Sequence, residues 1–139
     1  KIEINQNSYK YLSDNSADAS ADTAFFCCEQ NEKYMGQAKE SGAVIVTPKV
    51  LESIFDTKDM KIVGITGTNG KTTTAAAIYS FLLDLDESVA FLGTRGFFIN
   101  EDRVKEKGMT TPPLLEIMSD IFEAKKAGCE YFIMEVSSH

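Results

Sequence analysis

The segment Lys61-Ile-Val-Gly-Ile-Thr-Gly-Thr-Asn-Gly-Lys-Thr-Thr-Thr74 constrains the fold of this chain more than any other part of its sequence. An apolar run typical of a buried strand ends in a glycine-rich turn, which leads through Lys71 and Thr72 into a stretch of helical composition. This order of elements forms a phosphate-binding loop, because the turn and the helix N-terminus direct backbone N–H groups toward phosphate oxygens. We expect Lys71 to reach the β- and γ-phosphates of a nucleotide and the Thr72 hydroxyl to hold Mg²⁺. The alternative, an ordinary strand-to-helix turn with a surface lysine, leaves the coincidence of these four features unexplained.

The glycine spacing separates this loop from that of the common ATPases and GTPases. Their pattern has a glycine five residues before the glycine of Gly-Lys, whereas this chain has Ile65 there. Its own glycines occur at every third position, at Gly64, Gly67 and Gly70. The residues expected to contact the nucleotide are Gly67, Thr68, Asn69, Gly70, Lys71, Thr72 and Thr73.

The pattern of strands and helices predicts an α/β chain with two domains, residues 1–59 and 60–139, joined at the charged segment Asp56-Thr-Lys-Asp59. In the first, small domain we expect strands at 2–4, 23–28 and 43–47 and helices at 32–41 and 50–55. In the second we expect a strand at 61–66, a helix at 71–85, a strand at 88–92, a long loop at 93–109, a helix at about 112–127 with Thr111 as its N-cap, and a strand at 131–136. This βαβαβ order predicts parallel strands with right-handed crossovers, as in the first part of a P-loop ATPase domain.

Parallel strands end at one edge of the sheet, so this order brings three polar segments together. Glu135 ends the apolar strand Tyr131–Met134 and would lie across from the phosphate loop, where a Mg²⁺ ion needs an oxygen ligand. The alternative is a strand-end acid exposed to water. Ser137 follows the same strand, and it either binds a substrate or caps a following helix.

Thr110 and Thr111 precede two prolines and offer hydroxyls to an anion or a polar substrate. The alternative is a plain helix N-cap followed by proline.

Composition excludes several other classes of protein. The net charge of −7 argues against nucleic acid as the main partner, because a phosphate backbone requires a basic face. No apolar run approaches the ~20 residues that span a bilayer, so we expect no membrane segment. Cys27, Cys28 and Cys129 lack metal-ligand spacing and are typical of buried thiols in a reducing cytoplasm. His139 is the only histidine, so we expect no histidine-based metal cluster within this chain.

Three motifs in order resemble the Mur ligases of peptidoglycan synthesis, and within them the MurE-type branch. They are Gly64-Ile-Thr-Gly-Thr-Asn-Gly-Lys-Thr-Thr-Thr74, Thr110-Thr-Pro112 and Met134-Glu-Val-Ser-Ser-His139. The resemblance covers residues 61–139 strongly and residues 1–60 weakly. In the first domain, Asn15-Ser16 stands at the family's Asp-Ser-Arg position without the arginine, and Gln30–Tyr34 stands at its Asp-Gly-His position without Gly-His. Ser16 is the residue that the resemblance offers as a contact of the UDP substrate.

The resemblance implies ATP-dependent formation of an amide bond, with ATP and Mg²⁺ as cofactors. In the family, the γ-phosphate passes to the D-glutamate carboxylate of UDP-MurNAc-L-Ala-D-Glu, and the amine of meso-diaminopimelate or L-lysine attacks the resulting acyl phosphate. By this analogy Lys71 and Glu135 are catalytic, and Thr72 and Glu135 hold Mg²⁺. The residues expected to contact the UDP-sugar peptide are Ser16, Thr110, Thr111 and Ser137.

The resemblance also implies a cytoplasmic protein that acts as a monomer. Because the family has further domains, we expect this chain to be an N-terminal piece that is inactive alone. Two alternatives stay open: a folylpolyglutamate- or cyanophycin-type ligase of the same superfamily, and a regulatory module that binds ATP without ligation.

Overall fold

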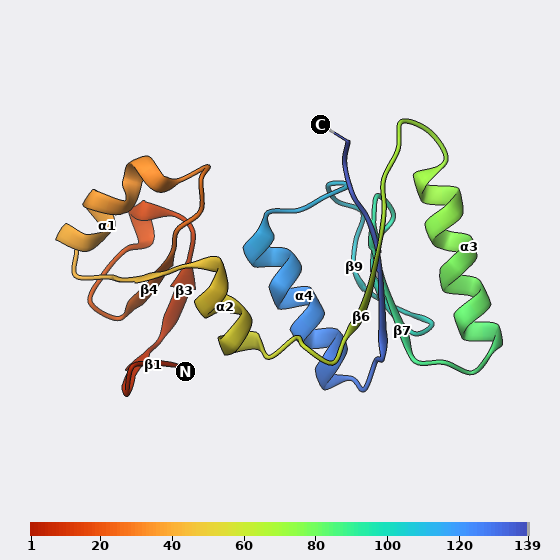
Figure 1. The fold of residues 1–139 in the computed structure, drawn as a ribbon, viewed down its shortest axis with the longest axis horizontal. Coiled ribbons are helices and arrows are strands. Elements are labelled where there is room, and N and C mark those ends of the chain that lie inside the picture. The colour runs from red at the N-terminus through yellow and green to blue at the C-terminus, as the bar shows by residue number, and fades with distance from the viewer. Residues whose placement is uncertain (139) are drawn as a thin grey trace. The chain divides into compact units, whose positions relative to one another are not determined.

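The computed structural model describes residues 1–138 and divides the chain into two compact units, Lys1–Asp56 and residues 57 onward (Figure 1). The division falls at the start of the charged segment Asp56–Asp59, where the sequence predicts a boundary. His139, the last residue of the third motif, lies outside the described residues.

The first unit contains a hairpin and a three-stranded parallel sheet. Strands β1 (Ile2–Ile4) and β2 (Asn7–Tyr9) pair antiparallel. The sheet has the order β3-β4-β5, with the bounds Tyr11–Ser13, Thr23–Phe26 and Val44–Val46. The helical segments are η1 (Ser16–Asp18), η2 (Glu32–Tyr34), α1 (Met35–Glu40) and α2 (Pro48–Phe55). Every residue of β4 is buried, and its Phe25 packs with Ala38 and Ala43 in the core of this unit.

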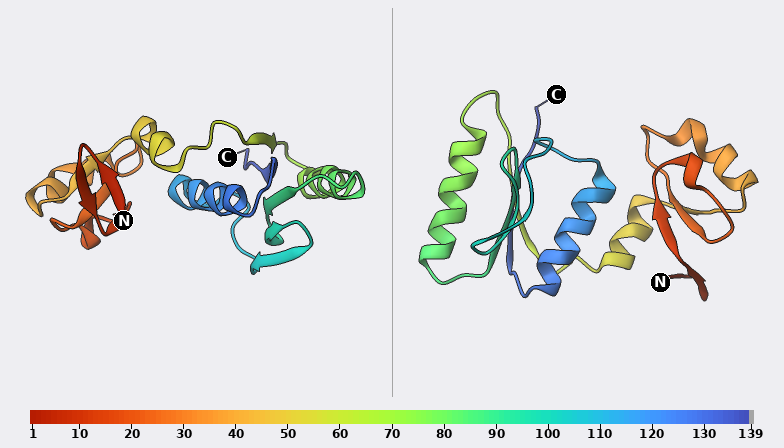
Figure 2. Two further views of the ribbon diagram at one scale, coloured as in Figure 1. Left: turned by 90° about the horizontal axis from the view of Figure 1, so that it is seen from below. Right: turned by 180° about the vertical axis from the view of Figure 1, so that it is seen from behind.

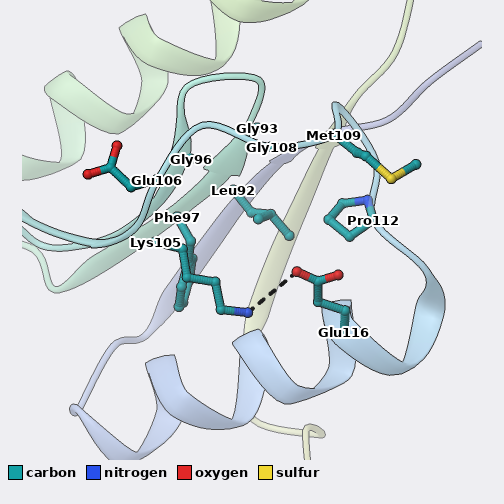
Figure 3. Close-up of a pocket in the computed structure, with 10 residues that line it drawn as sticks. All are labelled: Leu92, Gly93, Gly96, Phe97, Lys105, Glu106, Gly108, Met109, Pro112 and Glu116. Atoms are coloured by element: carbon teal, nitrogen blue, oxygen red, sulfur yellow. Dashed lines mark ion pairs between the residues drawn. The ribbon is translucent and has the colours of Figure 1, made fainter.

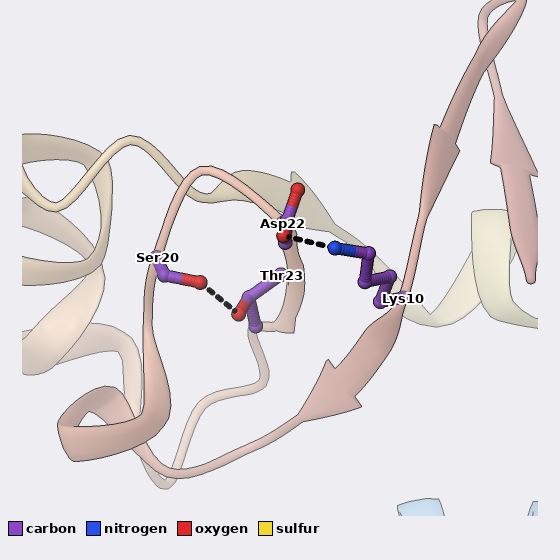
Figure 4. Close-up of polar contacts among 4 residues, drawn as sticks. All are labelled: Lys10, Ser20, Asp22 and Thr23. Carbon is purple, nitrogen blue, oxygen red and sulfur yellow. Dashed lines mark hydrogen bonds and ion pairs between the residues drawn. The ribbon is translucent and has the colours of Figure 1, made fainter.

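The turn before β4 is fixed by polar contacts (Figure 4). Lys10 forms an ion pair with Asp22 at 2.9 Å, and the hydroxyls of Ser20 and Thr23 share a hydrogen bond of 2.9 Å. Thr23 also donates to the Asp18 carbonyl, so this fully buried threonine keeps a partner as β4 enters the core.

The second unit has a five-stranded sheet with the order β6-β10-β7-β8-β9. The strands are β6 (Lys61–Ile65), β7 (Val89–Gly93), β8 (Gly96–Ile99), β9 (Asp102–Lys105) and β10 (Tyr131–Glu135). Helices α3 (Lys71–Asp84) and α4 (Leu114–Lys126) cover opposite faces of the sheet (Figures 1 and 2). Strand β10 pairs parallel with both β6 and β7, which confirms the predicted parallel α/β arrangement.

Aromatic and aliphatic side chains fill the space between α3 and the sheet. Ala75 of α3 packs with Val89, Phe91 and Ile133, all of which are buried. Phe91 also contacts Tyr79, with ring centroids 5.5 Å apart. The alternation of core residues along β7 and β10 and the small residue on α3 together allow the helix to lie close to the sheet.

The prediction of a long loop at 93–109 is wrong. Residues 96–105 form the hairpin β8–β9, which pairs antiparallel with β7 and extends the sheet. Asn100 adopts a left-handed conformation at its turn, with φ of 51°. Phe97 and Phe98 of β8 pack on opposite faces of the sheet, the buried Phe97 against Phe132 and the half-buried Phe98 against Phe91. Two adjacent aromatic residues hide the alternation that normally marks a strand.

The predicted start of α4 is also wrong. The helix begins at Leu114 after Pro113, and no side chain caps it. Thr111 is therefore not its N-cap, and its hydroxyl is free for the contacts described below.

All three cysteines are free thiols. Cys129 is buried as predicted, and burial raises the pKa of its thiol. Cys27 and Cys28 are only half-buried, so the prediction of buried thiols is wrong for these two residues. Within residues 1–138, no helix has the length and apolar character that crossing a membrane requires.

Candidate functional site

A cavity of about 240 Å³ opens at the edge of the sheet where β6, β7 and β10 end. It is lined by residues from the glycine loop, the start of α3, the end of β10 and the segments after β7 and before α4: Thr68, Asn69, Gly70, Lys71, Thr72, Thr73, Thr94, Thr110 and Glu135. The sheet thus brings together parts of the chain that are up to 67 residues apart (from Thr68 to Glu135).

The glycine loop has the backbone geometry of an anion site. Gly67 and Gly70 have φ of 141° and 80°, values that residues with a side chain rarely adopt. Gly70 is also the N-cap of α3, and it has no side chain that could accept a hydrogen bond from the first amides of this helix. These amides and the positive end of the helix dipole are therefore directed at the cavity. The ammonium of Lys71 donates to the Gly67 carbonyl at 2.5 Å, which places its charge over the loop.

Glu135 is the acidic group of the cavity. Its side chain is only 1% exposed, so the alternative of a strand-end acid in water is wrong. The Thr72 hydroxyl donates to Glu135 Oε2 at 3.0 Å, which joins the start of α3, the helix that follows the phosphate loop, to the end of β10. Gly93 makes room for this carboxylate, since a Cβ at Gly93 would lie 2.3 Å from Glu135 Oε1.

Thr94 is a residue of the site that the sequence did not predict. Its amide donates to Glu135 Oε1 at 3.3 Å, and its hydroxyl donates to Glu135 Oε2 at 3.0 Å. The same hydroxyl lies 3.3 Å from Thr110 Oγ1. The available signal was position, because Thr94 directly follows β7 at the edge where the ligand of an open parallel sheet binds.

Thr110 and Thr111 face different partners. Thr110 lines the cavity and contacts Thr94. The Thr111 hydroxyl donates to the Glu135 carbonyl at 3.4 Å and accepts from the Ser137 amide at 2.6 Å, so it fixes the segment that follows β10. Ser16 belongs to the first unit, where its hydroxyl donates to Gln37 Oε1 at 3.4 Å.

The oxygens of Thr72 and Glu135 fit a magnesium ion. Oγ1 and Oε2 are hard ligands that lie together at the mouth of the phosphate loop. Among residues 1–138, no group of three or more His, Cys, Asp or Glu side chains is arranged to hold a metal by protein ligands alone. This donor set suits Mg²⁺ in particular, because Mg²⁺ is commonly bound through one or two carboxylates together with substrate phosphates.

A second cavity, of about 250 Å³, lies between the β8–β9 hairpin and the start of α4 (Figure 3). Leu92, Phe97 and Met109 give it an apolar wall, and Lys105 pairs with Glu116 at 3.6 Å on its other side. Lys105 also pairs with the buried Asp120 at 2.5 Å.

Electrostatics at Asp120 follow from its burial. Burial raises the pKa of this carboxyl, and the hydrogen bond and charge of Lys105 offset the effect only in part. Burial alone would lower the pKa of Lys105, but the carboxyls of Asp120 and Glu116 outweigh it and raise this pKa above its ordinary value. The ion pair between Lys105 and Asp120 connects the end of β9 to α4, and so it links both sides of the intervening segment that carries Thr110.

Comparisons with known proteins agree with this geometry. Residues 65–139 match the family described as the Mur ligase middle domain. The chain is 48% identical over 140 residues to a UDP-N-acetylmuramoyl-L-alanyl-D-glutamate--2,6-diaminopimelate ligase of Wolinella succinogenes, covering 100% of this chain and 32% of that protein. It is 52% identical over 136 residues to the protein of the same name from Helicobacter pylori, covering 96% of this chain and 30% of that protein.

A relative named for a different amino acid, L-lysine, is also similar. The chain is 43% identical over 89 residues to a UDP-N-acetylmuramoyl-L-alanyl-D-glutamate--L-lysine ligase of Staphylococcus aureus, covering 63% of this chain and 18% of that protein. A solved structure of a 2,6-diaminopimelate ligase superposes with a TM-score of 0.68 at 23% identity, over 99% of this chain and 34% of that one, which shows a shared fold. The chain spans about a third of the length of the first two relatives.

Proposed function

The chain belongs to the Mur ligase family, and from this premise we propose that the full-length protein joins a diamino acid to UDP-MurNAc-L-Ala-D-Glu at the expense of ATP. The reaction would pass through an acyl phosphate on the D-glutamate carboxylate, which meso-diaminopimelate or L-lysine then attacks. The proposal is carried by one observation: the phosphate loop, the buried carboxylate of Glu135 and the hydroxyl of Thr110 line a single cavity. The names of the relatives, which specify this UDP-linked substrate, support the proposal.

Within this function, residues 60–139 would bind ATP and residues 1–59 the UDP part of the substrate, with Ser16 as a contact. The amides of Gly67–Thr73 would bind the phosphates, because they are directed at the cavity without side-chain caps. Lys71 would neutralise charge on the β- and γ-phosphates during transfer, which depends mainly on positioning and electrostatics.

Thr72 and Glu135 would hold Mg²⁺, which supplies further charge neutralisation on the phosphate oxygens. Thr110 would contact the UDP-sugar peptide directly. Thr111 and Ser137 would shape its site by fixing the end of β10, in accordance with their hydrogen bond.

The test measures phosphate release by the full-length protein with ATP, Mg²⁺ and UDP-MurNAc-L-Ala-D-Glu, adding meso-diaminopimelate or L-lysine in turn. We expect release that requires the UDP-dipeptide and one diamino acid, which also identifies that amino acid. Release with a folate or with a polypeptide acceptor instead would support a sister ligase, and ATP binding without release in any mixture would support a binding module.

A pair of lysine variants makes the test specific to the loop. Lys71→Met should lower the rate by about 100-fold or more, the usual effect of removing one group that stabilises charge in a transition state. Lys49→Met is the matched control, because Lys49 is an exposed residue of α2 in the other unit. Equal rates for the two variants would contradict the role of Lys71.

A further inference from the structure

Thr94 stands between the two halves of the proposed site. Its hydroxyl and its amide both donate to Glu135, on the side of the cavity that would hold Mg²⁺. Its hydroxyl also contacts Thr110, on the side that would hold the UDP-sugar peptide. A continuous series of hydrogen bonds therefore runs from Thr72 through Glu135 and Thr94 to Thr110.

The number of protons fixes the direction of this series. Each threonine hydroxyl has one proton, and a carboxylate only accepts. Thr72 Oγ1 and Thr94 Oγ1 both lie 3.0 Å from Glu135 Oε2, so each hydroxyl uses its one proton to donate a hydrogen bond to Glu135. Thr94 Oγ1 then has only lone pairs for its contact with Thr110, and Thr110 must be the donor in that 3.3 Å hydrogen bond.

The orientation of Thr110 has a consequence for the ligand. With its proton directed at Thr94, the Thr110 hydroxyl presents only acceptor lone pairs to the cavity. It therefore suits a hydroxyl or amide N–H of the substrate and disfavours a phosphate or carboxylate oxygen.

We propose that Thr94 is a positioning residue that joins the Mg²⁺-holding carboxylate Glu135 to the substrate contact Thr110, so that the Mg²⁺-nucleotide and the UDP-sugar peptide favour each other's binding. The inference rests on the proposed function, since it takes Thr110 as a contact of that substrate. The physical basis is shared order: a ligand that fixes Glu135 also fixes Thr94 and the donor direction of Thr110.

The experiment measures binding rather than turnover. Titration calorimetry on the full-length protein gives the Kd of UDP-MurNAc-L-Ala-D-Glu with and without Mg²⁺ and a non-hydrolysable ATP analogue. We expect the wild type to bind the UDP-dipeptide about fivefold or more tightly when the Mg²⁺-nucleotide is present, a typical size for coupling between two sites. Thr94→Val, which keeps the shape and removes the hydroxyl, should abolish this ratio, whereas Thr94→Ser should keep it.

A second variant reaches the same hydrogen bond from its other end. Thr110→Val leaves Glu135 with all its donors but removes the contact with Thr94, so it should also abolish the ratio. The double variant should then show no loss beyond that of either single variant. Binding of the Mg²⁺-nucleotide by each variant shows that the site has folded.

The outcomes separate this inference from the function on which it rests. A wild type that binds both ligands independently overturns the role of Thr94 and leaves the proposed function standing. Loss of coupling in Thr94→Ser as severe as in Thr94→Val also overturns it, because packing rather than the hydroxyl would then be responsible. A wild type that binds the nucleotide but never the UDP-dipeptide overturns the proposed function.

Discussion

Replacing Lys105 by methionine tests the electrostatics that hold α4 to the β8–β9 hairpin. Asp120 is 1% exposed, and within the described part of the chain its Oδ2 has no hydrogen-bond partner. The ammonium of Lys105, 2.5 Å from Asp120 Oδ1, is the positive charge that compensates this carboxylate. Methionine keeps most of the aliphatic stem and removes the ammonium. The variant thus leaves a buried carboxylate without its nearest cation. Removing one partner of a buried ion pair lowers stability strongly, because the remaining charge is no longer compensated.

The size of the loss has a ceiling set by protonation, because Asp120 can become neutral instead of remaining charged. Protonating a carboxyl whose unfolded pKa is about 3.9 costs about 4 kcal/mol at pH 7 and about 1.5 kcal/mol at pH 5. The pKa of Asp120 is already raised in the wild type, so the loss cannot exceed these values. Lys105 is 44% exposed, and water replaces part of its effect, so we expect about 1–3 kcal/mol at pH 7.

The sign of the pH dependence follows from the raised pKa. A carboxyl whose pKa is higher in the folded state contributes stability below its unfolded pKa, and this contribution is lost as the pH rises through the folded pKa. Removing Lys105 raises that pKa further. The gap between wild type and variant should therefore widen from pH 5 to pH 7.

Native-state hydrogen exchange of peptides from α4 of the full-length protein measures this local stability at each pH. Lys105→Arg keeps the charge and is the matched control, with an expected loss well below that of Lys105→Met. An equal loss at pH 5 and pH 7, or a larger one at pH 5, would refute the reasoning.

Three further substitutions test the packing around the site. Gly93→Ala should weaken Mg²⁺-nucleotide binding by about tenfold or more in calorimetry, because its Cβ would lie 2.3 Å from Glu135 Oε1 and overpacking of this kind costs about 1–3 kcal/mol; Gly108→Ala, whose Cβ would meet nothing closer than 4.0 Å, should bind normally. Phe91→Ala should destabilise the second unit in hydrogen exchange by about 3–5 kcal/mol, because Phe91 is 2% exposed, whereas Phe81→Ala at a 68% exposed position should change it by less than about 0.5 kcal/mol. Gly96→Ala should speed exchange throughout β8 and β9, because its φ of 119° disfavours a side chain and its Cβ would lie 2.3 Å from the Lys105 carbonyl; unchanged protection there would contradict this account.

The parallel core of the second unit could be predicted because its signals are local. The runs Lys61–Ile65 and Tyr131–Met134 are mainly apolar and end at a change to polar or glycine residues, and the helix after Lys71 has a strong composition signal. The prediction that the first of these strands is buried is wrong, because β6 lies at the edge of the sheet and Ile62 and Val63 are exposed. Given strands separated by helices, the crossover rule fixes their parallel direction and places Glu135 beside the loop. The prediction of Glu135 thus needed no knowledge of its contacts.

The β8–β9 hairpin could not be predicted in the same way, because what stabilises it lies elsewhere in the chain. Every residue of β9 is exposed, so this strand has no apolar face for a pattern to reveal. Strand β8 is held by Phe91 and Phe132, which come from two other strands. The role of Thr94 was hidden for the same reason, since it depends on Glu135, a residue 41 positions away.

Gly93 and Thr94 act as one feature of the site, although neither forms part of a recognisable motif. Glycine at the last position of β7 removes the Cβ that would otherwise occupy the place of Glu135 Oε1. The next residue then donates from both its amide and its hydroxyl to the carboxylate admitted there. A larger residue at position 93 would exclude the carboxylate, and a residue without a hydroxyl at 94 would leave it with fewer donors, so the two positions act with Thr72 to keep a buried acid fixed beside the phosphate loop.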